Sequence, residues 1–245
     1  MEINKTSIVN SLSGTNDDIF IHLPYLLQDL WELGGGTDRI LELLESNLSL
    51  FLPSSNILEL CCGKGAVITS IINKYKCTGT GIDLFEPFIR EAIDRAKQEN
   101  IQDILTFEVM DIKDAVATFR NYDLVVYGND TDVLGDESES LRKISKCCKP
   151  EGYIVYEILV KFYEEDIRFI NDLNLRIIDS SIAERDELVR INEFNNKKIR
   201  QRATELIAKY PEQKELFENY VAIQEKESEE LEDEFVLVRL LLQCK

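Results

Sequence analysis

The chain has 245 residues, of which 44% are hydrophobic, enough for the core of one α/β domain or of one domain with a sizeable insertion. Its formal net charge of −18 disfavours DNA or RNA as a partner, because the chain would repel a phosphate backbone. The sequence shows neither a signal-peptide core nor an apolar run of membrane-spanning length, so we expect a cytoplasmic protein without a membrane partner.

The N-terminal part is expected to form helices separated by glycines. A first helix would carry Leu26, Leu27, Leu30 and Leu33 on one side and would end at Gly34-Gly35-Gly36. Thr37 would cap a second helix over residues 38–48. We treat residues 1–52 as an N-terminal helical cap.

Strand and helix patterns alternate about five times from residue 57 onward. Strands are expected over residues 57–61, 77–83, 105–110, 122–127 and 153–159, and residues 149–152 should form a turn. Helices are expected over residues 66–75, from Pro87, and around Leu141, Ile144, Ser145 and Cys148. The strands are almost continuously apolar, which is typical of parallel strands covered on both faces. The pattern predicts an α/β fold with a doubly wound, mostly parallel sheet, whose core we assign to residues 53–160.

The last third of the chain, residues 161–245, is expected to complete this core. A strand is predicted over residues 175–178 and a final strand over 234–243. Between them, residues 184–232 form a charged helical insertion that is interrupted at Tyr210-Pro211.

The six cysteines are expected to be reduced and buried, because a disulfide framework is typical of small secreted chains. Cys61 and Cys62 would lie at the carboxyl end of the first strand, whereas Cys147 and Cys148 precede the fifth. The two pairs therefore cannot share a zinc ion, and we expect no metal site.

The segment Glu59-Leu60-Cys61-Cys62-Gly63-Lys64-Gly65 joins a strand to a helix, where backbone N–H groups can face a ligand. A P-loop would need a Ser or Thr after the Gly-Lys pair, and here Gly65 follows. A dinucleotide loop would need a third glycine, and here Ile68 occupies that position, which disfavours a dehydrogenase. A shorter turn remains, with room for a nucleoside or an amino-acid group.

This segment resembles the first motif of the class I S-adenosylmethionine-dependent methyltransferases, which commonly reads D/E-L-G-C-G-x-G, with Cys61 where glycine is usual. The resemblance covers roughly residues 20–160 and the final strand. It implies a seven-stranded Rossmann-like sheet with an antiparallel last strand, with S-adenosyl-L-methionine as the cofactor.

The resemblance also implies roles for single residues. Asp83 would accept both ribose hydroxyls, and Leu84 would pack on adenine. Asp111 would accept a hydrogen bond from the adenine amino group, and the N–H of Ile112 would meet a ring nitrogen. The strand that ends at Tyr127 would lie beside the methionine part. The cofactor-binding candidates are Gly35, Gly36, Glu59, Cys61, Gly63, Gly65, Asp83, Leu84, Asp111, Ile112 and Tyr127. From the residues alone, the glycines could be turn residues and the two aspartates helix caps.

The acceptor is expected to be a small molecule. Family members that methylate nucleic acids or protein amides often carry [DN]PP[YF] after the fourth strand, where this chain has Tyr127-Gly128-Asn129-Asp130. His22, Asp130 and Glu157 are candidates on the acceptor side, without an assigned catalytic role. A catalytically inactive binding module of the same fold, or a protein acceptor, are the alternatives. The sequence predicts no oligomeric state.

The stretch Gly34-Gly35-Gly36-Thr37 contains more glycine than a helix end needs, and glycine is costly to order. It resembles a glycine-rich segment that closes over the methionine end of the cofactor in related methyltransferases. We expect it to become ordered when the cofactor binds and to shield the sulfonium from water.

Overall fold

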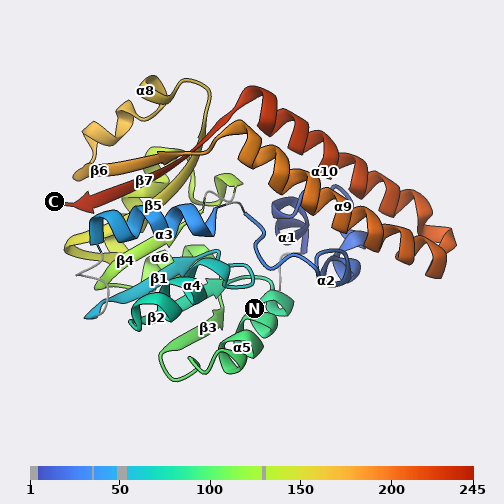
Figure 1. The fold of residues 1–245 in the computed structure, drawn as a ribbon, viewed down its shortest axis with the longest axis horizontal. Coiled ribbons are helices and arrows are strands. Elements are labelled where there is room, and N and C mark those ends of the chain that lie inside the picture. Colours follow the sequence, from blue (N-terminus) through green and yellow to red (C-terminus); the bar gives the residue numbers. More distant parts are fainter. Residues whose placement is uncertain (1–4, 35, 49–53, 129–130) are drawn as a thin grey trace. The chain divides into compact units, whose positions relative to one another are not determined.

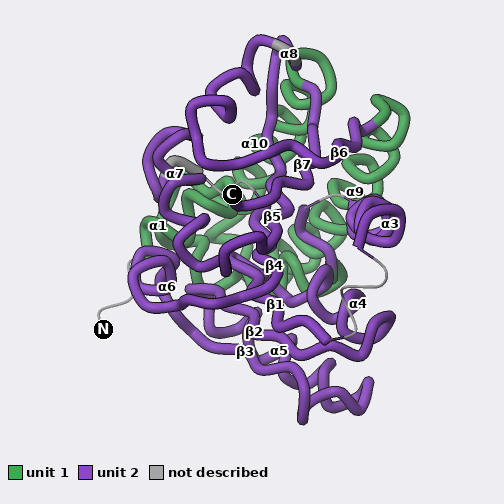
Figure 2. The backbone as a smooth tube through the Cα atoms, turned by 90° about the vertical axis from the view of Figure 1, so that its left-hand side faces the viewer, with its two compact units in different colours: residues 1–31, 184–235 green, residues 32–183, 236–245 purple. Residues whose placement is uncertain are grey.

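The computed structural model describes residues 5–34, 36–48, 54–128 and 131–245, and its contacts divide the chain into two compact units (Figure 2). The helical unit runs up to Trp31 and includes Glu184–Phe235, and the sheet unit comprises Glu32–Ala183 and Val236–Lys245. These units differ from the predicted division, because the helix that starts at Thr37 belongs with the sheet instead of with the other N-terminal helices.

The sheet unit contains one seven-stranded sheet with the strand order β3-β2-β1-β4-β5-β7-β6 (Figure 1). β1 to β5 pair in parallel, whereas β7 runs antiparallel to both of its neighbours. This confirms the predicted mostly parallel sheet with an antiparallel last strand. The strands are β1 (Asn56–Leu60), β2 (Thr78–Asp83), β3 (Leu105–Val109), β4 (Tyr122–Tyr127), β5 (Cys148–Val160), β6 (Leu175–Ile182) and β7 (Val236–Cys244).

Helices cover both faces of this sheet and form two apolar cores. Side chains alternate between the faces of a strand, so Ile57 of β1 packs with α3, α4 and α5, and Leu58 packs with α6 and α7. This double burial explains why the strands are apolar throughout. The helices are α3 (Thr37–Leu48), α4 (Ala66–Tyr75), α5 (Glu86–Gln98), α6 (Ile112–Thr118), α7 (Glu137–Ile144) and α8 (Tyr163–Asp166).

The start of β5 corrects two sequence predictions. Helix α7 ends at Ile144, and Cys148, expected in that helix, is the first residue of β5. The turn expected at residues 149–152 is an irregularity within the strand. Glu151 adopts a left-handed φ of 61°, and the pairing with β4 shifts register between Tyr122 and Leu124. A bulge of this kind bends a strand without ending its pairing.

The N-terminal helices are shorter than predicted. A 3-10 helix η1 (Asp17–His22) leads into α2 (Leu23–Leu26), and Leu27 already leaves the helical conformation with φ −102° and ψ 6°. A further helix, α1 (Lys5–Ser11), was not predicted. Thr37 is the first residue of α3 instead of its cap, and the carbonyl of Gly36 accepts from Ile40 N at 2.9 Å.

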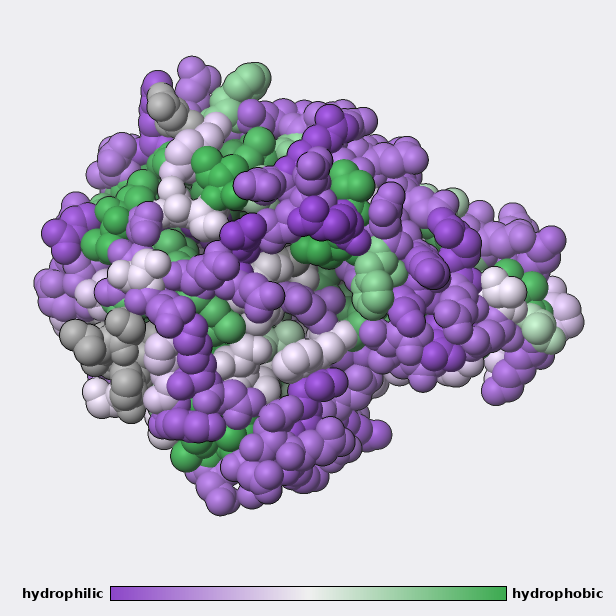
Figure 3. Space-filling model, viewed as in Figure 1, coloured by the Kyte–Doolittle hydropathy of each residue, from purple (hydrophilic) through white to green (hydrophobic). Residues whose placement is uncertain are grey.

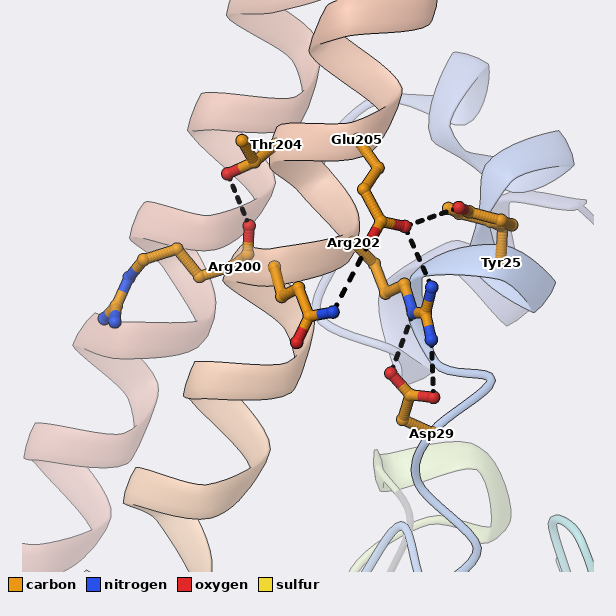
Figure 4. Close-up of polar contacts among 7 residues, drawn as sticks. Tyr25, Asp29, Arg200, Arg202, Thr204 and Glu205 are labelled. Atoms are coloured by element: carbon orange, nitrogen blue, oxygen red, sulfur yellow. Dashed lines mark hydrogen bonds and ion pairs between the residues drawn. The ribbon is translucent and has the colours of Figure 1, made fainter.

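The helical unit contains two long helices, α9 (Arg185–Lys209) and α10 (Lys214–Glu234), which are separated at the predicted position by the short helix η6 (Pro211–Gln213). Arg202 ties α9 to the N-terminal segment (Figure 4). Its Nε and Nη2 each donate to the carboxylate of Asp29 at 2.8 Å, and its Nη1 reaches Glu205, which also accepts from Tyr25 Oη. Paired guanidinium–carboxylate bonds fix orientation as well as distance.

Polar and charged residues cover most of the face seen in Figure 3, as expected for a chain with 30% charged residues. Large exposed apolar side chains such as Ile21, Phe162 and Phe194 come from separate segments of the chain. In the part of the chain that the structure describes, no helix combines the length and the apolar character needed to cross a membrane.

Candidate functional site

The glycine loop between β1 and α4 has the sharp backbone that its sequence predicts. Gly63 and Gly65 take φ values of 53° and 73°, and a Cβ on Gly65 would lie 2.6 Å from the ring of Phe107. Cys61 also has a positive φ, 54°, which costs a non-glycine residue about 1 kcal/mol. The glycine that is usual at this motif position therefore has a conformational reason, and Cys61 keeps the turn at some cost.

Asp83, the last residue of β2, lies beside this loop as predicted. Its Oδ2 accepts from Gly63 N and its Oδ1 from Phe85 N, both at 2.8 Å. Burial raises the pKa of the carboxyl, although these backbone hydrogen bonds oppose the shift. The predicted loop and the predicted acidic residue thus meet at the carboxyl ends of adjacent strands.

Glu59 is buried within β1 and faces the start of α4. Its Oε2 accepts from Ile68 N at 3.1 Å, one of the free N–H groups in the first turn of that helix. Burial raises its pKa to about 8, and the negative charges of Glu157, Asp83 and Glu32 add to the shift. Glu59 therefore fastens the loop to its helix.

The other cofactor-binding candidates follow β3, β2 and β4. Asp111 caps α6, since its Oδ1 accepts from Lys113 N at 2.8 Å, and the neighbouring Met110 N donates to Asp83 O at 3.0 Å. The helix-cap interpretation of Asp111 is thus correct, and it leaves the adenine role as a prediction. Leu84 is half-buried, whereas Ile112 and Tyr127 are buried.

The structure adds a residue that the sequence analysis missed, Arg239 of β7. Arg239 is fully buried and stands directly opposite Glu157 of β5, with its Nε 2.9 Å from Oε1 of the carboxylate. A Cβ on Gly36 would lie 1.9 Å from Nη2 of Arg239, so the guanidinium passes close to that backbone. The signal in the sequence was a single charged residue inside a largely apolar strand, because a buried charge needs a partner.

Burial raises the pKa of Glu157 to about 7, although Arg239 acts in the opposite direction. Glu157 is therefore a carboxyl that can change its protonation state near neutral pH. Two other predicted site residues, Gly35 and Asp130, lie outside the described residues.

His22 belongs to the helical unit and has a packing environment there. It is 7% exposed, its Nε2 lies 2.9 Å from Oε1 of Gln213, and its ring meets the edge of Phe217 at 4.9 Å. These contacts satisfy the ring without a substrate. Among the residues that are described, no group of three or more His, Cys, Asp or Glu side chains could hold a metal ion.

A groove of about 620 Å³ also lies in the helical unit, between η1 and α10. Asn16, Asp18, Glu212, Glu215 and Leu216 are among the residues that line it. The predicted cofactor-binding residues that the structure describes all belong to the sheet unit, and none of them lines this groove.

Comparisons with known proteins agree with this arrangement. Residues 57–152 match the family model of the methyltransferase domain. Two similar solved structures are S-adenosylmethionine-dependent methyltransferases in complex with S-adenosyl-L-homocysteine. The one from Thiobacillus denitrificans is 15% identical, with a TM-score of 0.75 and 91% of this chain and 98% of that chain covered. The one from Geobacter sulfurreducens is 14% identical, with a TM-score of 0.74 and coverage of 91% and 97%.

Coclaurine N-methyltransferase, bound to N-methylheliamine and S-adenosylhomocysteine, is 15% identical, with a TM-score of 0.60 and coverage of 84% of this chain and 72% of that chain. No curated protein matches the sequence. The matched residues span β1 to β4 and include the loop after β1. Residues 57–152 thus match a methyltransferase domain, and the chain has the fold of solved S-adenosylmethionine-dependent methyltransferases.

Proposed function

We propose that the protein binds S-adenosyl-L-methionine at the glycine loop and transfers its methyl group to a small-molecule acceptor. The observation that carries this proposal is the hydrogen bond from Gly63 N to Asp83 Oδ2 at 2.8 Å. It joins the loop after β1 to the acidic end of β2, at the edge where open α/β sheets bind their ligands.

The residues at this edge fit an adenosyl group. Asp83 offers carboxylate oxygens for ribose hydroxyls, and Asp111 offers one for an amino group. Half-buried Leu84 offers apolar surface for adenine, and the backbone N–H of Ile112 offers a donor for a ring nitrogen. Helix α4 begins directly after the left-handed Gly65, and the first turn of a helix offers backbone N–H groups to a ligand.

When bound, the cofactor supplies a methyl group on a sulfonium centre, which a nucleophile attacks in line. The protein's part in such a reaction is mainly to align the acceptor and to exclude water. Leu33 lies next to the loop, since a Cβ on Gly63 would be 3.1 Å from its Cδ1. In our proposal the segment from Leu33 to Thr37, which includes Gly36, closes this side of the site.

A small acceptor is supported by the charge of the chain and by the segment after β4. The net charge of −18 disfavours nucleic acids, and Tyr127-Gly128-Asn129-Asp130 departs from the motif of nucleic-acid and protein-amide methyltransferases. The similar coclaurine N-methyltransferase, to judge from the compound bound to it, supports a small acceptor as well.

The proposal is tested in two steps. Calorimetry with S-adenosylhomocysteine should detect binding at one site, and labelled S-adenosylmethionine should then transfer its label to a compound in a protein-free metabolite extract. Binding without transfer would favour an inactive module of this fold. Label that appears only in protein, when a lysate replaces the extract, would favour a protein acceptor.

A further inference from the structure

We propose that Glu157, held in place by Arg239, binds the reacting group of the acceptor, and that this group is an amine. The inference rests on the proposed function and deepens it, because it names the chemical class of the acceptor. It concerns only residues of the sheet unit.

The two oxygens of the Glu157 carboxylate have different environments. Oε1 accepts from Arg239 Nε at 2.9 Å. Oε2 has no hydrogen-bond donor among the described residues, and it points toward the end of β4, where a Cβ on Gly128 would lie 3.1 Å from it. The side chain is 15% exposed, so the carboxylate is neither sealed off nor free in solvent. One oxygen is thus fixed, and the other is left to receive a donor.

Because Gly128 has no Cβ, it does not crowd Oε2 with a side chain. Gly128 directly follows Tyr127, the last residue of β4 and the strand end assigned to the methionine part of the cofactor. A hydrogen-bond donor placed against Oε2 would therefore lie on the methionine side of the site. This is the side on which the reacting atom of an acceptor has to be held.

The charges around Glu157 favour a cation. Glu32 and Glu59 face this region from the segment before α3 and from β1, and Arg239 is the cation that faces Glu157. Lys64, the cation of the glycine loop, is paired with Glu91 at 2.8 Å. An ammonium group brings the positive charge and the N–H donors that Oε2 can accept, whereas a hydroxyl brings no charge.

The carboxylate of Glu157 can also accept the proton that the ammonium group of the acceptor must lose. An ammonium must lose one proton before its nitrogen can attack, and Glu157, whose pKa is raised to about 7, can take it. The nitrogen–methyl bond then forms as the methyl–sulfur bond breaks, and the electron pair of that bond stays on sulfur as a neutral thioether. The proton on Glu157 passes to solvent, so charge and atoms balance.

Arg239 acts through Glu157 and is a positioning residue. Because it is fully buried on β7, it cannot reach a ligand in solvent, but its charge keeps the neighbouring carboxyl ionised at lower pH. Loss of the guanidinium should therefore raise the pKa of Glu157. Lysine at this position would keep the positive charge but lack the planar guanidinium group. Arg239→Lys should therefore raise the pKa of Glu157 less than a neutral substitution does.

The test is equilibrium binding in the presence of saturating S-adenosylhomocysteine. The probes are aliphatic and arylalkyl primary and secondary amines, each matched with the alcohol in which a hydroxyl replaces the amino group. We expect the wild type to bind at least one amine at least about tenfold more tightly than its alcohol. Glu157→Gln, which keeps the shape and removes the charge, should abolish this preference. Glu42→Gln, on the exposed face of α3, is the matched control and should keep it.

The pH dependence of amine binding tests the role of Arg239. Simple amines stay protonated up to about pH 10, so binding should strengthen as pH rises through about 7 and Glu157 ionises. Arg239→Met should move this midpoint to higher pH, and Arg239→Lys should move it less. A midpoint that stays in place in Arg239→Met would overturn the positioning role.

Each remaining outcome is decisive. If S-adenosylhomocysteine binds but no amine is preferred over its alcohol, the inference is wrong and the proposed function stands. If S-adenosylhomocysteine does not bind at all, both fail. If amines are preferred equally by the wild type and by Glu157→Gln, another group recognises them.

Discussion

The N–H of Gly63 donates to Oδ2 of Asp83 over 2.8 Å, so the loop after β1 and the end of β2 are joined by the chain itself. The second oxygen of Asp83 is held by Phe85 N. A binding site whose parts are already fixed loses less conformational entropy when a ligand arrives. The same bond means that Asp83 has a structural role as well as its proposed role in ribose binding.

The first prediction concerns this aspartate. Asp83→Ala removes the acceptors for two ribose hydroxyls and should weaken binding of S-adenosylhomocysteine by roughly 2–4 kcal/mol in calorimetry. Asp94→Ala is the control, because Asp94 is an exposed acid on α5 that pairs with Lys97. An unchanged dissociation constant for a folded Asp83→Ala variant would rule out the ribose role.

A second prediction separates the two roles of Asp111. Asp111→Ser keeps a side chain that can cap α6, whereas Asp111→Ala loses the cap, which should cost about 1 kcal/mol of stability. If Asp111 also accepts from adenine, the wild type should bind an S-adenosylhomocysteine analogue with hypoxanthine more weakly than the natural compound. Equal affinity for both compounds would show that Asp111 is a cap alone.

The two described glycines before α3 give a matched pair of variants. Gly36 has φ 107°, and a Cβ there would meet Arg239 Nη2 at 1.9 Å, whereas a Cβ on Gly34 would meet nothing within 4 Å. Gly36→Ala should lower the free energy of unfolding by at least about 1–2 kcal/mol, because it combines backbone strain with displacement of the guanidinium. Gly34→Ala should stay within about 0.5 kcal/mol of the wild type. Urea denaturation measures the free energy of unfolding of both variants. Equal values would contradict the close approach of Arg239 to Gly36.

The buried Glu59 predicts how stability depends on pH. A glutamate whose pKa is raised in the folded state, here from 4.5 to about 8, stabilises the fold fully below its unfolded pKa and loses that contribution as pH rises through 8. Between pH 5 and pH 8 the wild type should therefore lose on the order of 3 kcal/mol more stability than Glu59→Gln. Urea titrations at the two pH values measure this difference. Parallel losses in both proteins would show that Glu59 is not the group responsible.

The segment before α3 should respond to the cofactor. We predict that the amides of Leu33, Gly36 and Thr37 exchange more slowly with solvent when S-adenosylhomocysteine is bound, because the segment closes beside Gly63. Hydrogen exchange with and without the compound tests this, with the helical unit as the internal reference. Protection of Gly63 and Gly65 alone would show that the segment is a passive connector.

Much of the sheet could be predicted from the sequence, because apolar strands and amphipathic helices alternate there with distinct periods. The loop at Gly63 and Gly65 and the acid at Asp83 could be predicted for the same reason, since each directly follows a strand. The start of β5 could not, because a bulge that holds Glu151 in a left-handed conformation continues a strand through a turn-like sequence.

The ion pair between Arg239 and Glu157 also could not be predicted from the sequence. Their pairing depends on β7 lying antiparallel beside β5, and 81 residues separate the two positions along the chain. A pattern of local periodicity carries no information on such a register. The predicted length of α2 was wrong as well. The leucines at 26, 27, 30 and 33 have helical spacing, but the helix ends at Leu26 and the backbone at Leu27 is no longer helical.

The place of β7 between β5 and β6 has a consequence for how the protein is made. During synthesis, β1 to β6 leave the ribosome before residues 236–244, so the nascent sheet has a gap where an inner strand belongs. Until that strand arrives, the facing edges of β5 and β6 are open to unwanted pairing, and Glu157 is without its arginine. A chain that stops just before Val236 would keep the glycine loop, yet it would lose the interior of its sheet.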